Sequence, residues 1–306
     1  MQPNPLLRKL GFSDTDRVAI LHADDVGMCQ ASAAAFVELY DFGLVSSGTV
    51  MVPCPWFLQA AAFARQHPDA DLGVHLTLTA EWPTYRWGPI STRDPQSGLI
   101  DEEGYFQHFT WPAMQAGQPA AVQVEIEAQV QRAIAAGMQP THADTHMGVL
   151  GSEKFMLGYL RMAIAQRLPP LLFRKDEAGW LAEGLKPAAA AQAAAMTQML
   201  EGLGMPMLDH MTGLRLDQPE NRLAQAKAAV DALQPGITHF IFHPAQDTPE
   251  LRAITPDWPS RVGDYQVLLS EALRAHLKAQ DVHVIGYRAM QQHMPDPSLA
   301  QALPLS

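Results

Sequence analysis

The chain has 306 residues, of which 47% are hydrophobic, so it can bury a sizeable core as two average domains or as one large α/β barrel. Its formal net charge of −11 argues against nucleic acid or an anionic membrane as the main partner. Its two cysteines have neither metal-binding nor redox spacing, and no window is apolar enough to cross a bilayer. Because the N-terminus lacks an apolar leader, we expect a cytoplasmic protein.

Strand-like runs rich in β-branched residues alternate with helix-like segments along almost the whole chain. Strands are predicted at 17–22, 45–52, 72–79, 139–143, 170–174, 206–210, 237–243 and 282–286. Helices are predicted at 31–42, 119–136, 187–201, 219–233 and 263–279. This alternation predicts a parallel sheet covered by helices, and about eight units favour a closed or distorted (β/α) barrel as a single domain over 1–306. An open doubly wound sheet is the alternative.

Residues 80–118 interrupt the alternation as an aromatic-rich insertion. They contain Trp82, Trp87, Trp111, Tyr85 and Tyr105 without a clear periodicity. A long loop without secondary structure of its own is usually functional or disordered, and this one is too aromatic for disorder. Because the loops of such barrels form the site, these rings could stack on a sugar. The alternative is that they pack onto the barrel itself.

Reactive side chains gather at predicted strand ends. Asp24 and Asp25 follow the first strand, His142 and His146 lie just past the fourth, and His243 ends the seventh. The carboxyl ends of the strands of a (β/α) barrel face one mouth, so these residues are expected to converge there. The two aspartates have opposite strand parity, so both can reach one site only where the strand gives way to a turn.

Adjacent carboxylates repel each other unless a cation or a division of roles separates them. If Asp25 binds a metal ion, the charge of the ion keeps Asp24 ionised as a base near neutral pH. The alternative is that one aspartate caps the following helix. His75 alternates with apolar residues in its strand and falls on the polar face, where it is either a metal ligand or a hydrogen-bonded core residue.

The remaining histidines allow several roles. His142 and His146 are four residues apart, a spacing that offers two ligands from a helix, or one ligand and one outer partner from a strand end. Asp144, between them, could orient a ligand imidazole. His243 precedes a proline, and an imidazole that binds no metal is suited to proton donation near neutral pH. A capping or core role for His243 is the alternative.

Four motifs in order resemble the YdjC-like carbohydrate deacetylase family, which includes chitooligosaccharide deacetylases and is related to NodB-type polysaccharide deacetylases. The motifs are Ala23-Asp-Asp-Val-Gly, Gly73-Val-His-Leu, Thr141-His-Ala-Asp-Thr-His and His243-Pro. The resemblance covers most of the chain and implies a distorted (β/α) barrel. It also implies one divalent ion held by Asp25, His75 and His146, with Asp24 as the general base.

Three departures from the family pattern leave the substrate open. His22 stands where the family usually has asparagine, and Val26 stands where it has phenylalanine. Met147-Gly-Val-Leu replaces the His-rich run that often follows the last ligand motif. None of these departures removes an implied ligand or the implied base.

The expected function is metal-dependent hydrolysis of the acetyl amide of an N-acetylated sugar or oligosaccharide. Three protein ligands leave a metal-bound water free to attack the acetyl carbonyl while Asp24 takes its proton. His243 would protonate the departing nitrogen, and Arg174 and His142 could contact substrate, Arg174 alternatively orienting Asp24. The ion could be zinc, magnesium, manganese or cobalt.

Two other classes of protein fit less well. A sugar isomerase or a phosphoesterase on a similar barrel would be expected to show more carboxylates or more ligands in total. A sugar-binding protein without turnover would not require a base beside a ligand. The substrate is a small molecule in every case, and a homo-oligomer is compatible with the sequence.

Overall fold

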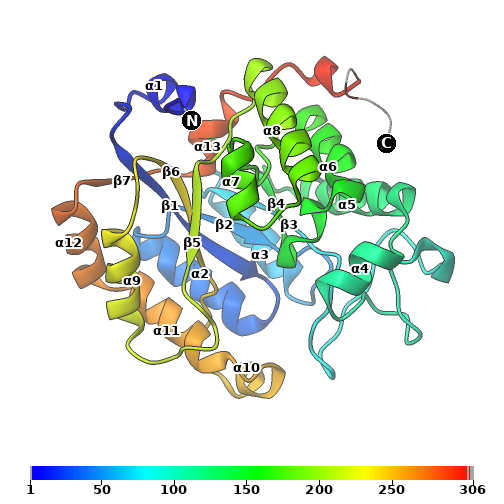
Figure 1. Cartoon of the computed structure of the whole chain (residues 1–306). Coiled ribbons are helices and arrows are strands. Elements are labelled where there is room, and N and C mark those ends of the chain that lie inside the picture. The colour runs from blue at the N-terminus through cyan, green and yellow to red at the C-terminus, as the bar shows by residue number, and fades with distance from the viewer. Residues whose placement is uncertain (1, 302, 304–306) are drawn as a thin grey trace.

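The structure is a computed structural model that describes residues 2–301 and 303. Its centre is a seven-stranded sheet in the order β4-β3-β2-β1-β6-β5, and β7 pairs with the first half of β1 (Figure 1). Every pairing in this sheet is parallel. The strands are β1 (Arg17–Val26), β2 (Ser47–Val50), β3 (Leu72–Leu76), β4 (Ala143–Thr145), β5 (His210–Gly213), β6 (Gly236–Phe242) and β7 (Val282–Val284).

Isolated parallel bridges join the two ends of this sheet. Ala143 of β4 pairs with Pro170, and Phe173 pairs with Leu208, two residues before β5. The sheet therefore curls into a distorted (β/α) barrel, and the predicted fold class is confirmed. Within the described residues, the predicted strand 170–174 contributes only these bridges. Its first residue is one of two consecutive prolines, Pro169 and Pro170, which have no N–H to donate to a ladder.

Helices surround the sheet, with α9, α11 and α12 on one side in Figure 1 and α5, α6 and α8 on the other. Predicted helices 31–42, 119–136 and 187–201 correspond to α2, α5 and α8, whereas 263–279 is split into α11 and α12. Helices α3 and α6 lie outside the predicted set. The helices are α1 (Pro5–Lys9), α2 (Gln30–Phe42), α3 (Phe57–Gln66), α4 (Thr110–Ala116), α5 (Pro119–Ala135), α6 (Glu153–Ala165), α7 (Glu177–Ala182), α8 (Pro187–Gly202), α9 (Arg222–Asp231), α10 (Pro249–Ile254), α11 (Trp258–Leu268), α12 (Glu271–Ala279) and α13 (Tyr287–Gln291).

Strand β1 lies in the middle of the sheet and carries two kinds of side chain. Ala19 and Leu21 pack outward against residues of α9, α11 and α12. Val18 and Ile20 pack in a second apolar cluster with residues of β6 and α13. Continuing this alternation, His22 and Asp24 point to the same face as Val18 and Ile20. The barrel interior is therefore apolar near the start of β1 and polar near its end.

The aromatic insertion packs against the barrel and is partly helical. It contains a short 3₁₀ helix, η1 (Pro95–Ser97), and α4 lies near its end. Trp82 and Trp87 are buried with ring centres 5.6 Å apart, and the Trp87 indole donates to the carbonyl of Thr79. These two tryptophans therefore pack onto the barrel, whereas Trp111 is 67% exposed. In the described residues, no helix combines the length and apolar character needed to cross a membrane.

Candidate metal centre

A β-bulge near the end of β1 places both aspartates in the barrel interior. Ala23 lies opposite Gly48 and Val26 opposite Val50, so Asp24 and Asp25 share one partner position on β2. Asp25 has a φ of 61°, in the left-handed region that aspartate tolerates better than most residues. The bulge removes the parity conflict between the two neighbours, and both carboxylates are buried.

Three side chains at the ends of β1, β3 and β4 present one atom each to a common point. His75 Nε2 lies 3.4 Å from Asp25 Oδ1 and 3.2 Å from His146 Nδ1. The remaining edge of the triangle, from His146 Nδ1 to Asp25 Oδ1, is 3.3 Å. His146 is the first residue of a short 3₁₀ helix, η2 (His146–Gly151), directly after β4. The structure thus brings together the three residues that the sequence motifs implied as ligands.

The outward atoms of the same three side chains all have charged partners. His75 Nδ1 lies 2.6 Å from Asp144 Oδ1, and His146 Nε2 lies 3.1 Å from Glu81 Oε2. A carboxylate accepts, so each of these ring nitrogens carries a hydrogen, and in the neutral form of each ring the inward nitrogen has the lone pair that a metal ion needs. The second oxygen of Asp25, Oδ2, accepts from Arg261 Nη1 at 2.7 Å.

This triangle fits a divalent cation. Two nitrogen lone pairs and one carboxylate oxygen face each other, and the buried Asp25 Oδ1 has no hydrogen-bond partner. Edges of 3.2–3.4 Å are short enough for all three atoms to reach one ion at the usual ~2.0–2.3 Å. A donor set of two nitrogens and one oxygen suits zinc and is also compatible with magnesium, manganese or cobalt.

In the metal-free protein, the close contacts among these ionisable groups shift their pKa values. Despite burial, contacts with His146, His75 and Arg261 hold the pKa of Asp25 well below its usual value. Burial opposes protonation of His146, yet Glu81 and Asp25 raise its pKa to about 9. In the same way Asp144 and Asp24 raise the pKa of His75 well above its usual value. The site attracts positive charge, as protons or as a metal ion.

Asp24 and His243 lie beside the triangle. Asp24 Oδ2 is 3.9 Å from His75 Nε2 and 3.8 Å from His243 Nε2. Despite burial, the charge of His75 and a hydrogen bond from His22 lower the pKa of Asp24. The His243 side chain directly follows β6 and is 23% exposed, so it lies at the open side of the centre.

Behind Asp24 lies a buried group of rings that sequence analysis treated only in part. His22 Nδ1 is 2.7 Å from Asp24 Oδ1, and His22 Nε2 is 2.9 Å from His142 Nε2. His142 stacks on Tyr287 with ring centres 3.9 Å apart, and the Tyr287 hydroxyl lies 3.0 Å from His239 Nδ1. Burial and the neighbouring His22 lower the pKa of His142 well below its usual value, and burial lowers that of His239 to about 3. Both rings are therefore neutral.

Two predicted substrate contacts are corrected by these positions. His142 is fully buried behind Asp24, so a substrate at the mouth does not reach it. Arg174 pairs with Glu201 and with Asp209, whose other oxygen accepts from the backbone N–H of Ile237. That N–H lies at the start of β6, the end of the barrel opposite the centre. Arg174 therefore joins α8 to the floor of the barrel and orients neither Asp24 nor a substrate.

Glu81 and Arg261 are the site residues that sequence reasoning missed. Glu81 lies in the irregular insertion. Arg261 lies on α11, and its Nε also donates to Asp257, the residue before that helix, at 2.8 Å. Neither belongs to a motif with recognisable spacing. Arg261 precedes the predicted helix 263–279, so its charge alone could have indicated it, and a single arginine is too common to be specific.

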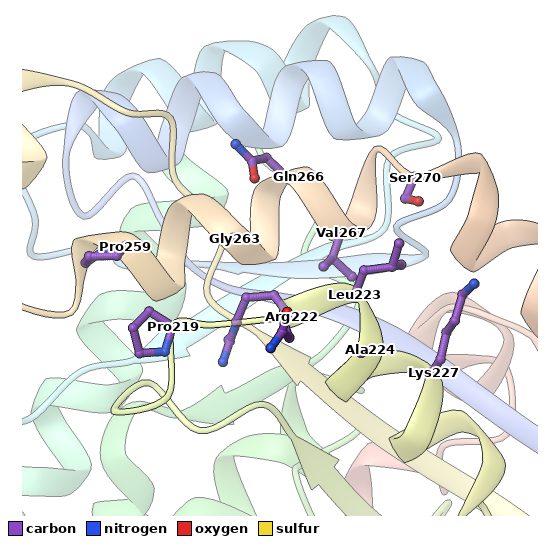
Figure 2. Close-up of a pocket in the computed structure, with 11 residues that line it drawn as sticks. Pro219, Arg222, Leu223, Ala224, Lys227, Pro259, Gly263, Gln266, Val267 and Ser270 are labelled. Atoms are coloured by element: carbon purple, nitrogen blue, oxygen red, sulfur yellow. The ribbon is translucent and has the colours of Figure 1, made fainter.

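A separate pocket of about 650 Å³ opens between α9 and α11 (Figure 2). Arg222 lines it and pairs with Asp264, which also accepts from the backbone N–H of His243 at 2.9 Å. None of the residues that line this pocket belongs to the candidate centre. The buried Arg222–Asp264 pair links this pocket to the backbone of His243.

The fold and the triangle together define a (β/α)-barrel protein with a candidate mononuclear metal centre at the carboxyl ends of its strands. The profile of the family described as YdjC-like protein matches residues 18–279. The chain belongs to this family, as its motifs predicted.

Named relatives cover much of the chain. A carbohydrate deacetylase from Thermus thermophilus is 34% identical over 287 residues, which are 94% of this chain and 98% of that protein. A chitooligosaccharide deacetylase from Serratia marcescens is 29% identical over 164 residues, 53% of this chain and 61% of that protein. A crystal structure from Enterococcus faecalis, described as a candidate cellobiose-phosphate cleavage protein, matches with a TM-score of 0.71 at 23% identity. That match covers 90% of this chain and 99% of the other, and it supports the fold.

Proposed function

We propose that the protein is a metal-dependent hydrolase that removes the acetyl group from an N-acetylated sugar or oligosaccharide. The observation that carries the proposal is the triangle of Asp25 Oδ1, His75 Nε2 and His146 Nδ1 with Asp24 directly beside it. The relatives named carbohydrate deacetylase and chitooligosaccharide deacetylase support the choice of reaction and substrate class.

Hydrolysis of an amide requires an activated water, a stabilised oxyanion and a protonated leaving nitrogen. A divalent ion bound at the triangle would lower the pKa of water and polarise the acetyl carbonyl. Asp24 is the general base of the proposal. His22 holds its Oδ1, so Oδ2 faces the centre and accepts the proton of the attacking water.

His243 is the proposed general acid. An amine is a poor leaving group until it is protonated, so the sugar nitrogen needs a donor at the mouth. His243 lies on the open side of Asp24, and its Nδ1 has no hydrogen-bond partner that would hold the ring in one orientation. After Asp24 has taken a proton, His243 delivers one to the nitrogen as the C–N bond breaks.

The rival enzyme classes require a different donor set. A bimetallic phosphoesterase needs further free ligands next to the triangle. The neighbouring group of His22, Asp24, Asp144 and His239 could offer them, but His22, Asp24 and Asp144 already hydrogen-bond to other side chains. Only one of the three atoms in the triangle comes from a carboxylate, whereas an isomerase is expected to use more.

Acetate release tests the proposal. The purified protein is incubated with N-acetylglucosamine and its short β-linked oligomers, and acetate is measured before chelation, after chelation and after adding back single divalent ions. We expect release that stops with chelator and returns with at least one ion. Undiminished release from a protein shown to be metal-free would contradict the metal requirement. If all these sugars retain their acetyl groups at every ion tested, the deacetylase assignment is wrong.

A further inference from the structure

The start of the insertion returns to the metal centre through Glu81. Its Oε2 lies 3.1 Å from His146 Nε2, and the two side chains are 17% and 6% exposed. A pair so well shielded from water is stronger than an exposed ion pair. The other two ligands have outer partners on β4 and α11, whereas His146 depends on a loop residue.

The contact selects which ring nitrogen of His146 faces the ion. With the hydrogen on Nε2 donated to Glu81, the lone pair of Nδ1 points at the two other corners of the triangle. Turning the ring over would replace both nitrogens with carbon and break both contacts at once. Glu81 therefore favours a single orientation of the ligand.

Two hydrogen bonds from the insertion hold the backbone just before Glu81. The N–H of Ala80 donates to the carbonyl of Gln107 at 2.9 Å, and the indole of Trp87 donates to the carbonyl of Thr79 at 2.8 Å. The far arm of the insertion reaches the residue that follows this ligand, because the Thr110 hydroxyl donates to the carbonyl of Met147 at 3.0 Å. Both arms of the insertion thus flank His146.

We propose that Glu81 is a positioning residue for the metal centre and that the folded insertion 80–118 sets the metal affinity through it. Glu81 holds His146 with Nδ1 toward the ion and does not itself bind the ion. The inference rests on the metal-dependent function proposed above. Outer carboxylates of this kind typically contribute 10–100-fold to metal affinity.

Zinc affinity of the full-length protein tests this role. The dissociation constant is measured by competition with a chromogenic chelator for the wild type, Glu81→Ala and Glu81→Gln. We expect Glu81→Ala to bind zinc about 10–100-fold more weakly, with Glu81→Gln in between, because the amide oxygen still accepts from Nε2. Glu103→Gln is the matched control, since Glu103 lies on the same insertion and pairs with Arg86 at the surface. Its affinity should equal that of the wild type.

Nitrogen NMR of histidine-labelled, zinc-loaded protein gives a readout that does not depend on turnover. In the wild type we expect His146 to show a zinc-bound Nδ1 and a protonated Nε2, and in Glu81→Ala a weaker preference for that state.

Wild-type affinity in a folded Glu81→Ala variant would overturn the proposal. Equal and complete loss of zinc in both variants would also overturn it, because Glu81 would then be a ligand. If the wild type itself binds no divalent ion, the proposed function fails as well, so the two failures are distinguishable.

Discussion

At the scale of residues, the β-bulge formed by Asp24 and Asp25 gives these neighbouring aspartates different surroundings. Asp24 has its Oδ1 held by His22, and Asp25 has its Oδ2 held by Arg261. Each carboxylate keeps one oxygen directed at the centre. With an imidazole donor behind Asp24 and a guanidinium donor behind Asp25, the proposed function assigns the first as base and the second as ligand.

The first prediction concerns Asp24→Asn. The amide oxygen can still accept from His22, but the group facing the centre cannot take a proton from water. We expect unchanged metal content and folding, with turnover lowered by about 10²–10⁴-fold. Acetate release and metal content are measured on the same preparation. Near-normal turnover in a metal-replete variant would show that Asp24 is only a structural neighbour.

The second prediction concerns His243→Ala. If His243 protonates the leaving nitrogen, the variant should lose far more activity on an acetyl amide than on an acetyl ester with a phenolate leaving group, because the phenolate departs unprotonated. The backbone N–H of residue 243 keeps its bond to Asp264, so the fold should persist. The comparison needs both substrates and a metal assay. Equal losses on both, accompanied by loss of metal, would instead make His243 a support for the ligands.

At the scale of elements, helix α5 completes the strand that carries His75. Thr77 lies just past β3 and is fully buried, and both its backbone groups bond to one side chain. Its N–H donates to Gln129 Oε1 at 2.9 Å, and Gln129 Nε2 donates to its carbonyl at 2.8 Å. Gln129 thus replaces a neighbouring strand at the point where the ladder between β3 and β4 ends.

The third prediction follows from these two bonds. Gln129→Met keeps the shape of the side chain but leaves two buried backbone groups without partners, each of which costs ~1–3 kcal/mol. We expect the free energy of unfolding to fall by about 2–6 kcal/mol in a denaturant titration. Gln131→Met is the control on the exposed face of the same helix and should change it by less than ~0.5 kcal/mol. Similar values for the two variants would mean that the Thr77 groups find other partners.

The alternation of elements and the ligand motifs could be read from the sequence because both depend on local patterns. β-branched runs mark the strands, and parallel strand ends meet at one mouth, so Asp25, His146 and His243 could be expected there. The choice of Asp25, His75 and His146 as ligands came from the resemblance to the family. The bulge at Asp24–Asp25 could not be derived, since it depends on the register against β2. Arg174 was misplaced because it lies near a strand end in sequence, while its partner Asp209 belongs to the opposite end of the barrel.

At the scale of the whole molecule, the barrel is polar on the side of its mouth, and that polarity affects stability. His142 and His239 are fully enclosed, and burial lowers the pKa of both, that of His239 to about 3. In the unfolded chain each would titrate near ~6.5. Below that pH the unfolded state binds protons that the folded state does not, so stability is present above pH 6.5 and is lost as the pH falls.

The last prediction tests this link between pH and the free energy of unfolding in the chelator-treated protein. His75 and His146 are protonated in the folded state below about pH 6.5, since their folded pKa values are raised. In the unfolded state they are about half protonated near pH ~6.5 and become fully protonated below it, so they add only a small slope of opposite sign. Unfolded carboxylates titrate nearer ~4, so the two buried rings are expected to dominate the range from about pH 6.5 to 5. There His142 and His239 should each lower the free energy of unfolding by about 1.5 kcal/mol.

His239→Asn identifies the contribution of one ring. Its amide oxygen can accept from the Tyr287 hydroxyl as Nδ1 does, but it takes up no proton. Denaturant titrations at several pH values should show about half of the wild-type loss in this variant. The prediction fails if the free energy of unfolding depends on pH equally in the wild type and the variant. The His239 ring would then not be neutral in the folded state, contrary to what its burial indicates.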